Sequence, residues 1–425
     1  MMISREKFNI VNHFFVVIIA ALMVFREIST PILVLFFLWN AFHFKYLDFK
    51  SIEKKHFLWI ASPFLIHVLF LWNDDLLSAS LQQLEKNIAF FLLPLFILSN
   101  KKSYDFYKIA WQHSLLLVGI LWIFLFRFII AFPEKIEKYI NGIDLIEVGY
   151  EFAKSMNTHA PALNKHIVFV SVIGFYFMLK YLFEKKYNRL ISSSFIAFSG
   201  FVFVLIVNTR IALFCVILLY LVVAISHLNK RFSTPKVVLY SGGVLLVSSL
   251  MIYAFVQINP YMKEKYSTVT FHHIDKIGRL DEIPNPEIQV FNSFVTRLSI
   301  YKSTYELAVR ELPFGTGAAD AQPALNDYYK ETNQKFLAQW EFPVHNQFLN
   351  YLLKFGVLGA VVFLFISVYP IAVGWISKNI LATSFGLLFF ISNLTDDFLI
   401  RYDGIVFCAL FCSLFAVGRL QYRIK

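Results

Sequence analysis

Long apolar runs, separated by short polar gaps, restrict the fold of this chain more than any other feature. Two of them, residues 237–256 and 357–373, are longer than a buried helix of a soluble protein normally needs. Apolar residues make up 58% of the chain and charged residues 16%, whereas soluble domains average about 45–50% and about 25%. A soluble helical protein with a large apolar core is the alternative, but it does not account for these runs. We therefore expect an all-α, polytopic integral membrane protein.

The runs predict about twelve transmembrane helices, with each run forming one membrane crossing. Their expected positions are residues 8–25, 29–44, 57–73, 87–99, 109–132, 166–183, 190–208, 211–227, 237–256, 346–373, 380–394 and 404–418.

Lysine and arginine residues gather in every second gap between the runs. Residues 54–55, 101–102 and 230–231 are basic pairs, whereas residues 74–75 in an intervening gap are both acidic. Because short cytoplasmic loops carry the excess of Lys and Arg, this alternation places both chain ends in the cytoplasm. The same alternation explains the net charge of +11 without a nucleic-acid partner, and the expected surroundings are membrane lipids.

This topology leaves one large periplasmic loop, at residues 257–344. The loop separates helices 1–9, in residues 1–256, from helices 10–12, in residues 345–425. Within residues 297–312, apolar side chains recur at helical spacing and predict an amphipathic helix that lies on the membrane surface or on the helix bundle. They are Leu298, Tyr301, Tyr305, Ala308 and Leu312. A second short helix is expected at residues 325–337, so the loop is partly helical and packs on the bundle.

Three residues are candidates for chemistry. Arg210 lies at the periplasmic ends of two runs, where it either anchors a helix to lipid phosphates or binds a pyrophosphate with its planar fork of donors. Arg297 begins the amphipathic helix, and its simplest interpretation is a solvated charge. His345 follows Pro343 at the start of the tenth run. A histidine there usually caps the helix or bonds at the surface, but a neutral one can also act as a general base toward a sugar hydroxyl.

Asn346, His159 and Tyr301 are further candidates, for contacts with a glycan. Asn346 adds a donor and an acceptor beside His345, whereas ordinary loop polarity explains His159 equally well. The sequence contains no Walker loop, no dinucleotide-binding glycine fingerprint and no zinc-type His/Glu spacing. We therefore expect neither a cofactor nor a metal ion.

Asp396, Asp397 and Arg401 share one short gap between runs, and we expect them to pair with each other. The three cysteines all fall inside apolar runs, so no disulfide is expected.

Four stretches of the sequence share a recognisable order. They are NTRIALFCVILLYL at 208–221, RLSIYKSTYELAVRELPFGTGAADA at 297–321, HNQFLNYLLKFGVLGAVVFLFI at 345–366 and NLTDDFLIRYDGIVFCALF at 393–411. An arginine opens a span, an arginine-led helix runs into a Pro-Phe-Gly-x-Gly turn, and a His-Asn helix with spaced glycines follows. In this order the stretches resemble the O-antigen ligase and polymerase family of bacterial membrane glycosyltransferases.

The resemblance implies a metal-independent, inverting glycosyltransferase of the bacterial inner membrane, with its site facing the periplasm. The implied donor is a glycan on undecaprenyl diphosphate, and the implied acceptor is a sugar such as that of lipid A–core, in lipopolysaccharide biosynthesis. Arg210 and Arg297 would bind the diphosphate, and His345 would activate the acceptor hydroxyl.

Two alternatives stay open at the level of the sequence. An O-antigen polymerase that joins lipid-linked repeat units would share the same histidine and arginine pattern. A flippase or another transporter of lipid-linked glycans belongs to a different class, but the chain shows no internal repeat of the kind common in transporters.

Overall fold

The computed structural model describes residues 3–141, 148–258, 273–291 and 293–424, and every regular element within them is a helix. The long helices are α1 (Arg5–Leu22), α2 (Arg26–Phe42), α3 (Lys54–Leu69), α5 (Ala89–Leu98), α6 (Phe106–Ala131), α9 (Ala160–Phe183), α10 (Tyr187–Val207), α11 (Arg210–Leu228), α12 (Thr234–Ile258), α18 (Gln347–Ser377), α19 (Ile380–Asn393) and α20 (Tyr402–Ile424). The shorter ones are α4 (Leu77–Lys86), α7 (Pro133–Asn141), α8 (Val148–Ser155), α14 (Pro286–Gln289), α15 (Phe294–Arg310), α16 (Ala321–Glu331) and α17 (Lys335–Trp340).

Nine helical segments of the described chain are long and apolar enough to cross a membrane. They include α6, α9 to α12, α18 and α20, together with the segments Lys54–Asn73 and Leu77–Leu98. The predicted class, an all-helical multi-pass membrane protein, is therefore confirmed. Each of the twelve predicted runs overlaps a separate long helix, although a count of twelve spans stays a prediction.

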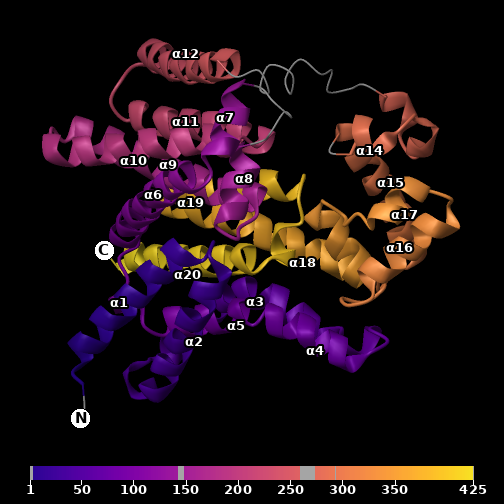
Figure 1. The fold of residues 1–425 in the computed structure, drawn as a ribbon. Coiled ribbons are helices and arrows are strands. Elements are labelled where there is room, and N and C mark those ends of the chain that lie inside the picture. Colours follow the sequence, from indigo (N-terminus) through magenta and orange to yellow (C-terminus); the bar gives the residue numbers. More distant parts are fainter. Residues whose placement is uncertain (1–2, 142–147, 259–272, 292, 425) are drawn as a thin grey trace.

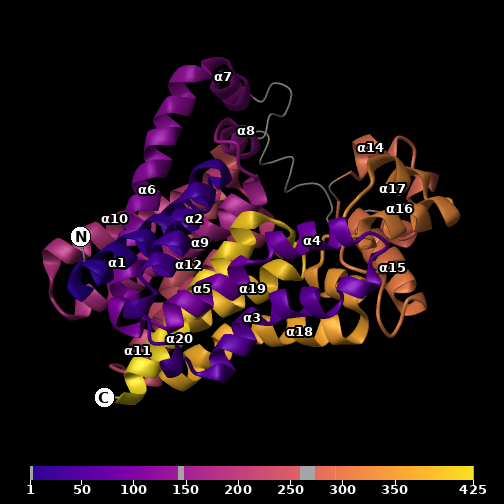
Figure 2. The same cartoon turned by 90° about the horizontal axis from the view of Figure 1, so that it is seen from below.

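Helix α20 lies at the centre of the bundle and α12 lies at its edge (Figure 1). The apolar window of α20 is 83% buried, whereas that of α12 is only 17% buried. Around α20 pack α5, α18 and α3, while α9 packs against α10 and α11. The two chain ends lie on the side of the bundle away from α14 to α17 (Figures 1 and 2). An arrangement with both ends on one side agrees with the topology that the basic residues predict.

Helices α15, α16 and α17 form a compact unit at one end of the bundle, which we call the cap (Figure 2). The cap has its own hydrophobic cluster, in which Ile300, Leu325 and Tyr329 are fully buried and Phe336 nearly so. Leu353 of α18 belongs to the same cluster, so burial of apolar surface binds the cap to the start of α18.

Two predictions about this segment were wrong in detail. The buried side of α15 consists of adjacent pairs of residues that repeat every four positions, so it is rotated from the predicted stripe. Of that stripe, Tyr305 is 56% exposed, and Leu312 lies beyond the end of the helix and is 41% exposed. Small polar residues such as Ser299 and Thr304 occupy the buried side instead, and their hydroxyls bond back to carbonyls one turn earlier. The single helix expected at 325–337 is two helices, because Asn333 adopts a left-handed backbone that ends α16.

A turn that follows α15 is inserted into a break in α18. Gly356 interrupts that helix with φ 59° and ψ −147°, a conformation that side chains exclude. A Cβ atom at this position would lie 1.8 Å from the carbonyl oxygen of Pro313. The amides of Thr316 and Gly317 bond to carbonyls of α18 over 2.8 and 3.1 Å. The cap and α18 therefore form one continuous backbone framework.

Candidate functional site

The loop between α19 and α20, residues 394–401, is bound by side chains of the cap. Arg297 of α15 donates from Nη1 to a backbone carbonyl of this loop over 2.8 Å. The hydroxyl of Tyr301, one turn further along α15, donates to the carbonyl of His345 at 2.9 Å and to that of Leu394 at 3.1 Å. The cap thus brings three predicted residues, Arg297, Tyr301 and His345, to one place.

The first residues of α18 bind the same loop from the bundle. Asn346 donates from Nδ2 to the carbonyl of Leu394 over 3.1 Å, and its Oδ1 accepts the amides of the first helical turn. Gln347 accepts from the amide of Leu399 over 2.8 Å. Asn346 is therefore an N-cap whose side chain also positions the loop. Because both its amide oxygen and its amide nitrogen already form hydrogen bonds within the protein, it has less capacity to bond a glycan than its sequence position indicates.

His345 lies between these groups in a left-handed backbone conformation, with φ 52°. A residue with a Cβ adopts this region at a cost of about 1–3 kcal/mol and is commonly found there at functional sites. Burial, and then the positive charge of Arg297, lower the pKa of His345 to about 4. The imidazole is consequently neutral at pH 7 and has one nitrogen lone pair to accept a proton.

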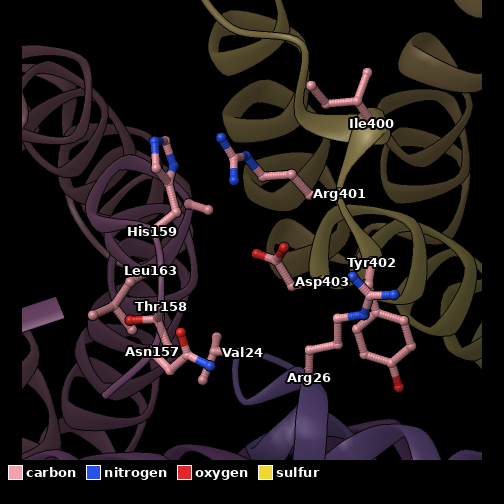
Figure 3. Close-up of a pocket in the computed structure, with 11 residues that line it drawn as sticks. Val24, Arg26, Asn157, Thr158, His159, Leu163, Ile400, Arg401, Tyr402 and Asp403 are labelled. Atoms are coloured by element: carbon pink, nitrogen blue, oxygen red, sulfur yellow. The ribbon is translucent and has the colours of Figure 1, made fainter. Parts of the chain in front are cut away.

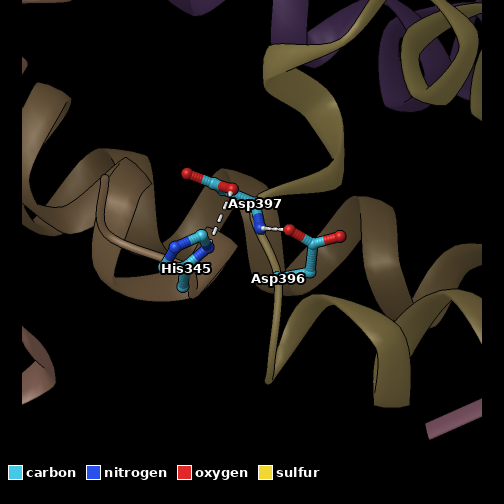
Figure 4. A group of neighbouring side chains, drawn as sticks. All are labelled: His345, Asp396 and Asp397. Atoms are coloured by element: carbon cyan, nitrogen blue, oxygen red, sulfur yellow. Dashed lines mark hydrogen bonds and ion pairs between the residues drawn. The ribbon is translucent and has the colours of Figure 1, made fainter. Parts of the chain in front are cut away.

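Two adjacent aspartates lie beside His345 (Figure 4): the carboxylate of Asp397 faces the ring, whereas that of Asp396 accepts the amide of Asp397 over 3.0 Å. Its Nδ1 lies 4.0 Å from Oδ1 of Asp397, and the ligand atoms of His345, Asp396 and Asp397 all lie within 4.8 Å of one another. Asp397 is buried, and its Oδ2 has no hydrogen-bond partner in the part of the chain that the structure describes. A carboxylate on the Nδ1 side of the ring favours a proton there and leaves Nε2 as the basic nitrogen.

Asp396 forms an ion pair with Lys165 of α9. Burial by itself would raise its pKa, but the charge and the hydrogen bond of Lys165 hold the pKa of Asp396 well below its usual range. Burial and the neighbouring Asp396 charge raise the pKa of Asp397. The predicted pairing of both carboxylates with Arg401 was wrong in one respect: within the described residues, the ion-pair partner of Asp396 comes from α9.

His345, Asp396 and Asp397 are close enough together to bind a metal ion, but the charges around them oppose one. Lys165 already neutralises Asp396, and the charges of Arg297 and Arg401 also act on the histidine. A divalent cation would have to displace an ammonium group and enter a region of positive potential. The cations around the cluster, Lys165, Arg297 and Arg401, therefore favour an anionic ligand beside it over a bound cation.

Arg210 lies at the first position of α11 with an exposed side chain. The preceding Thr209 accepts a hydrogen bond from Asn164 of α9 over 3.0 Å, and Asn164 is adjacent to Lys165. The start of α11 is thus joined to the turn of α9 that holds Asp396. Among the contacts between described residues, none joins Arg210 to His345 or to Arg297.

His159 lies before α9 and lines a cavity of about 330 Å³ (Figure 3). Burial, and then the charge of Arg401, lower its pKa to about 4. Arg26 from the start of α2 and Asp403 from α20 line the same cavity. Arg401 in the cavity wall and Asp396 and Asp397 of the cluster belong to one short loop, residues 394–401, so this loop connects the cavity with the His345 cluster.

Lys165 and Arg26 belong to the site, but neither was predicted from the sequence as a site residue. A lysine inside an apolar helix is costly and marks a functional or paired residue, but the sixth run was expected to begin at residue 166, which left Lys165 in a loop. The helix begins six residues earlier, at Ala160, and Lys165 is buried. Nothing in the sequence indicated a binding role for Arg26, because an arginine between two membrane spans is common.

Together, the fold and the cluster define a multi-pass, all-helical membrane protein with a charged polar site at one end of its bundle. Residues 193–364 match the protein-family model described as O-antigen ligase. This segment contains Arg210, Arg297 and His345, so the resemblance found in the sequence is confirmed, and the match supports a function of the O-antigen ligase or polymerase type. Among curated proteins compared with the chain, none matched it.

Proposed function

We propose that this protein is a glycosyltransferase of the bacterial inner membrane that moves a glycan from undecaprenyl diphosphate to a sugar acceptor such as lipid A–core. The observation that carries the proposal is the meeting of a partly buried, neutral histidine with cationic side chains at one end of the bundle. The family match over residues 193–364 supports the same class of reaction. The site faces the periplasm if the basic gaps lie in the cytoplasm.

In the proposed reaction, Nε2 of His345 accepts the proton of an acceptor hydroxyl as that oxygen attacks the anomeric carbon of the donor. The bond from the anomeric carbon to the diphosphate oxygen breaks, and the electron pair leaves with the lipid diphosphate. Attack from the face opposite the leaving group inverts the configuration. Asp397 holds the ring with Nδ1 protonated, and Tyr301 fixes the backbone carbonyl of His345.

Arg297 supplies positive charge where the diphosphate departs, and we assign the same role to the exposed Arg210. A guanidinium group binds phosphate oxygens in bidentate fashion and stabilises the charge that develops on them. These arginines then do what a divalent cation does in other transferases. Reconstituted protein should therefore keep its transfer rate in EDTA. A rate lost in EDTA and restored by Mg²⁺ would refute the metal-independent mechanism.

The decisive test is surface-glycan analysis in a strain that lacks its own copy, complemented with wild type or with His345→Gln at matched protein level. Wild type should restore glycan on lipid A–core. His345→Gln should leave the polymer on its carrier lipid, with transfer slowed on the order of a hundredfold or more. Full complementation by His345→Gln would refute the catalytic assignment.

The same strain separates the two alternatives. If the deletion leaves single repeat units attached to the core, the protein is a polymerase. If the lipid-linked glycan accumulates on the cytoplasmic face instead, the protein is a transporter. The proposed transferase leaves a complete polymer on carrier lipid at the periplasmic face.

A further inference from the structure

The cavity beside the His345 cluster has the size of a binding site for one small group. Its volume of about 330 Å³ falls at the lower end of the range of about 300–1,000 Å³ that small-molecule sites occupy. Three separate parts of the chain form its wall: the start of α2, the start of α9 with the loop before it, and residues 400–403 at the start of α20. A cavity bounded by segments so far apart in sequence exists only in the completed fold.

Two arginines give this cavity an affinity for an anion. Arg26 and Arg401 lie on opposite sides of Asp403 (Figure 3), so two guanidinium groups face one carboxylate. That carboxylate already lies 3.2 Å from Nε2 of His166. Nε of Arg401 and Nδ1 of His159 are buried and have no hydrogen-bond partner among the described residues. Buried polar atoms without partners are uncommon, and a small rotation of either side chain toward the cavity would let a ligand supply the missing bond.

The remaining lining fits a sugar rather than a bare anion. Thr158 and Asn157 offer oxygen atoms as well as donors, and Asp403 can accept hydrogen bonds from hydroxyl groups. Leu163 and Val24 add apolar surface, which the C–H face of a pyranose can cover. Asn157 is held in place by a 2.8 Å bond to Glu27 at the start of α2.

We propose that this cavity binds a residue of the acceptor glycan that carries an anionic group, a phosphate or a carboxylate on a sugar. The inference rests on the proposed function and adds a substrate class to it. The anionic group binds the guanidinium group of Arg26, and a hydroxyl group of the sugar donates to Asp403, which lies between Arg26 and Arg401. The next sugar of the acceptor then extends along the loop 394–401 toward His345, because this loop carries both Arg401 of the cavity and Asp397, which lies 4.0 Å from His345.

The test is equilibrium dialysis of labelled glucose 6-phosphate against the full chain in phosphatidylcholine nanodiscs. Glucose and inorganic phosphate serve as competitors that each carry only one half of the expected ligand. Arg26→Gln removes one cationic wall, and Arg26→Lys restores the charge without the fork of donors. Lys154→Gln is the matched control, because Lys154 is an exposed cation on α8 outside the cavity. A thermal midpoint equal to that of wild type shows that each variant is folded.

Glucose 6-phosphate should bind roughly tenfold more tightly than either competitor. Arg26→Gln should weaken it roughly tenfold, as loss of a charged hydrogen bond does. Arg26→Lys should recover part of the loss, and Lys154→Gln should bind like wild type. Equal binding of inorganic phosphate, or no effect of Arg26→Gln, overturns the proposal. Loss of sugar phosphate binding in discs that contain phosphatidylglycerol assigns the cavity to a lipid headgroup and also overturns it.

This experiment needs no turnover, so it separates the two proposals. If no sugar phosphate binds while His345→Gln still abolishes transfer, the acidic-acceptor site is refuted and the proposed function stands. If sugar phosphate binds and Arg26→Gln weakens it, but His345→Gln transfers glycan normally, the cavity assignment holds and the catalytic assignment fails.

Discussion

His345 combines a strained backbone with a neutral side chain, and each property depends on its neighbours. The left-handed φ of 52° lets the chain reverse direction immediately before Asn346 caps α18. The hydrogen bond from Tyr301 to its carbonyl fixes that reversal. A base held this way does not have to reorient during the reaction, because its position is determined before substrate binds.

The low pKa of His345 has a measurable consequence for the pH dependence. An ordinary histidine, with a pKa of about 6.5, is mostly protonated at pH 5.5. His345, with a pKa of about 4, is still neutral there and can accept a proton. Asp397→Asn removes the neighbouring carboxyl group, whose pKa is raised to about 6. In this variant we therefore expect the transfer rate of reconstituted protein to change by less than about twofold between pH 7.5 and 5.5, and to fall as the pH approaches 4.

If the rate of this variant falls around pH 6.5, His345 titrates as an ordinary histidine and its low pKa is refuted. Wild type provides the comparison, because protonation of Asp397 adds an acidic limb near pH 6 to its profile. If wild type and the variant have the same profile, the limb belongs to the histidine alone.

The ion pair of Lys165 with Asp396 makes a second prediction. Both side chains are largely buried, with exposed fractions of 6% and 13%. Lys165→Met leaves a buried carboxylate without its counter-ion, which costs about 3–5 kcal/mol of stability. Adding Asp396→Asn removes the uncompensated charge, so the double variant should recover part of the loss. The midpoint of thermal unfolding in nanodiscs measures both, and a double variant no more stable than Lys165→Met would contradict the pairing.

Among the elements, α18 depends on a glycine in its interior. The turn at residues 313–317 reaches its place only because Gly356 has no Cβ. Gly356→Ala should therefore separate the cap from α18 and lower the thermal midpoint, in spite of the better helix propensity of alanine. Gly243→Ala in α12 is the control, because nothing lies within 4 Å of a Cβ at that position. Equal midpoints for the two variants would contradict the docking of the turn.

The long helices could be predicted from the sequence because a bilayer requires continuous apolar runs, and these are visible without knowledge of tertiary contacts. The contacts of α15 could not. Half of its eight buried residues are serines and threonines, and hydroxyls such as those of Ser299 and Thr304 bond to their own helix. Hydropathy therefore identified the helix but not the face that packs. The pairing of Lys165 with Asp396 joins positions 231 residues apart, and only the packing of α9 beside α20 reveals it.

For the whole molecule, the topology is the prediction with the widest consequences. Both chain ends lie away from the cap, so the cap should be periplasmic if the ends are cytoplasmic. The three native cysteines are buried and give little background in labelling. We expect a membrane-impermeant maleimide to label Lys330→Cys, in α16, on intact spheroplasts. Lys378→Cys, between α18 and α19, should react only after the membrane is permeabilised. The opposite pattern would invert the proposed orientation.

The final hairpin, α19 and α20, has a consequence for biosynthesis. It contributes Asp396, Asp397 and Arg401. Asp396 pairs with Lys165, which lies 231 residues earlier in the chain, and Arg401 lines one cavity with Arg26. A ribosome releases the chain from its amino terminus onward, so a nascent protein can insert α1 to α18 and still have no carboxylate beside His345. The cluster around His345 is therefore completed only after α19 and α20 have been inserted, and a chain truncated before them should lack it.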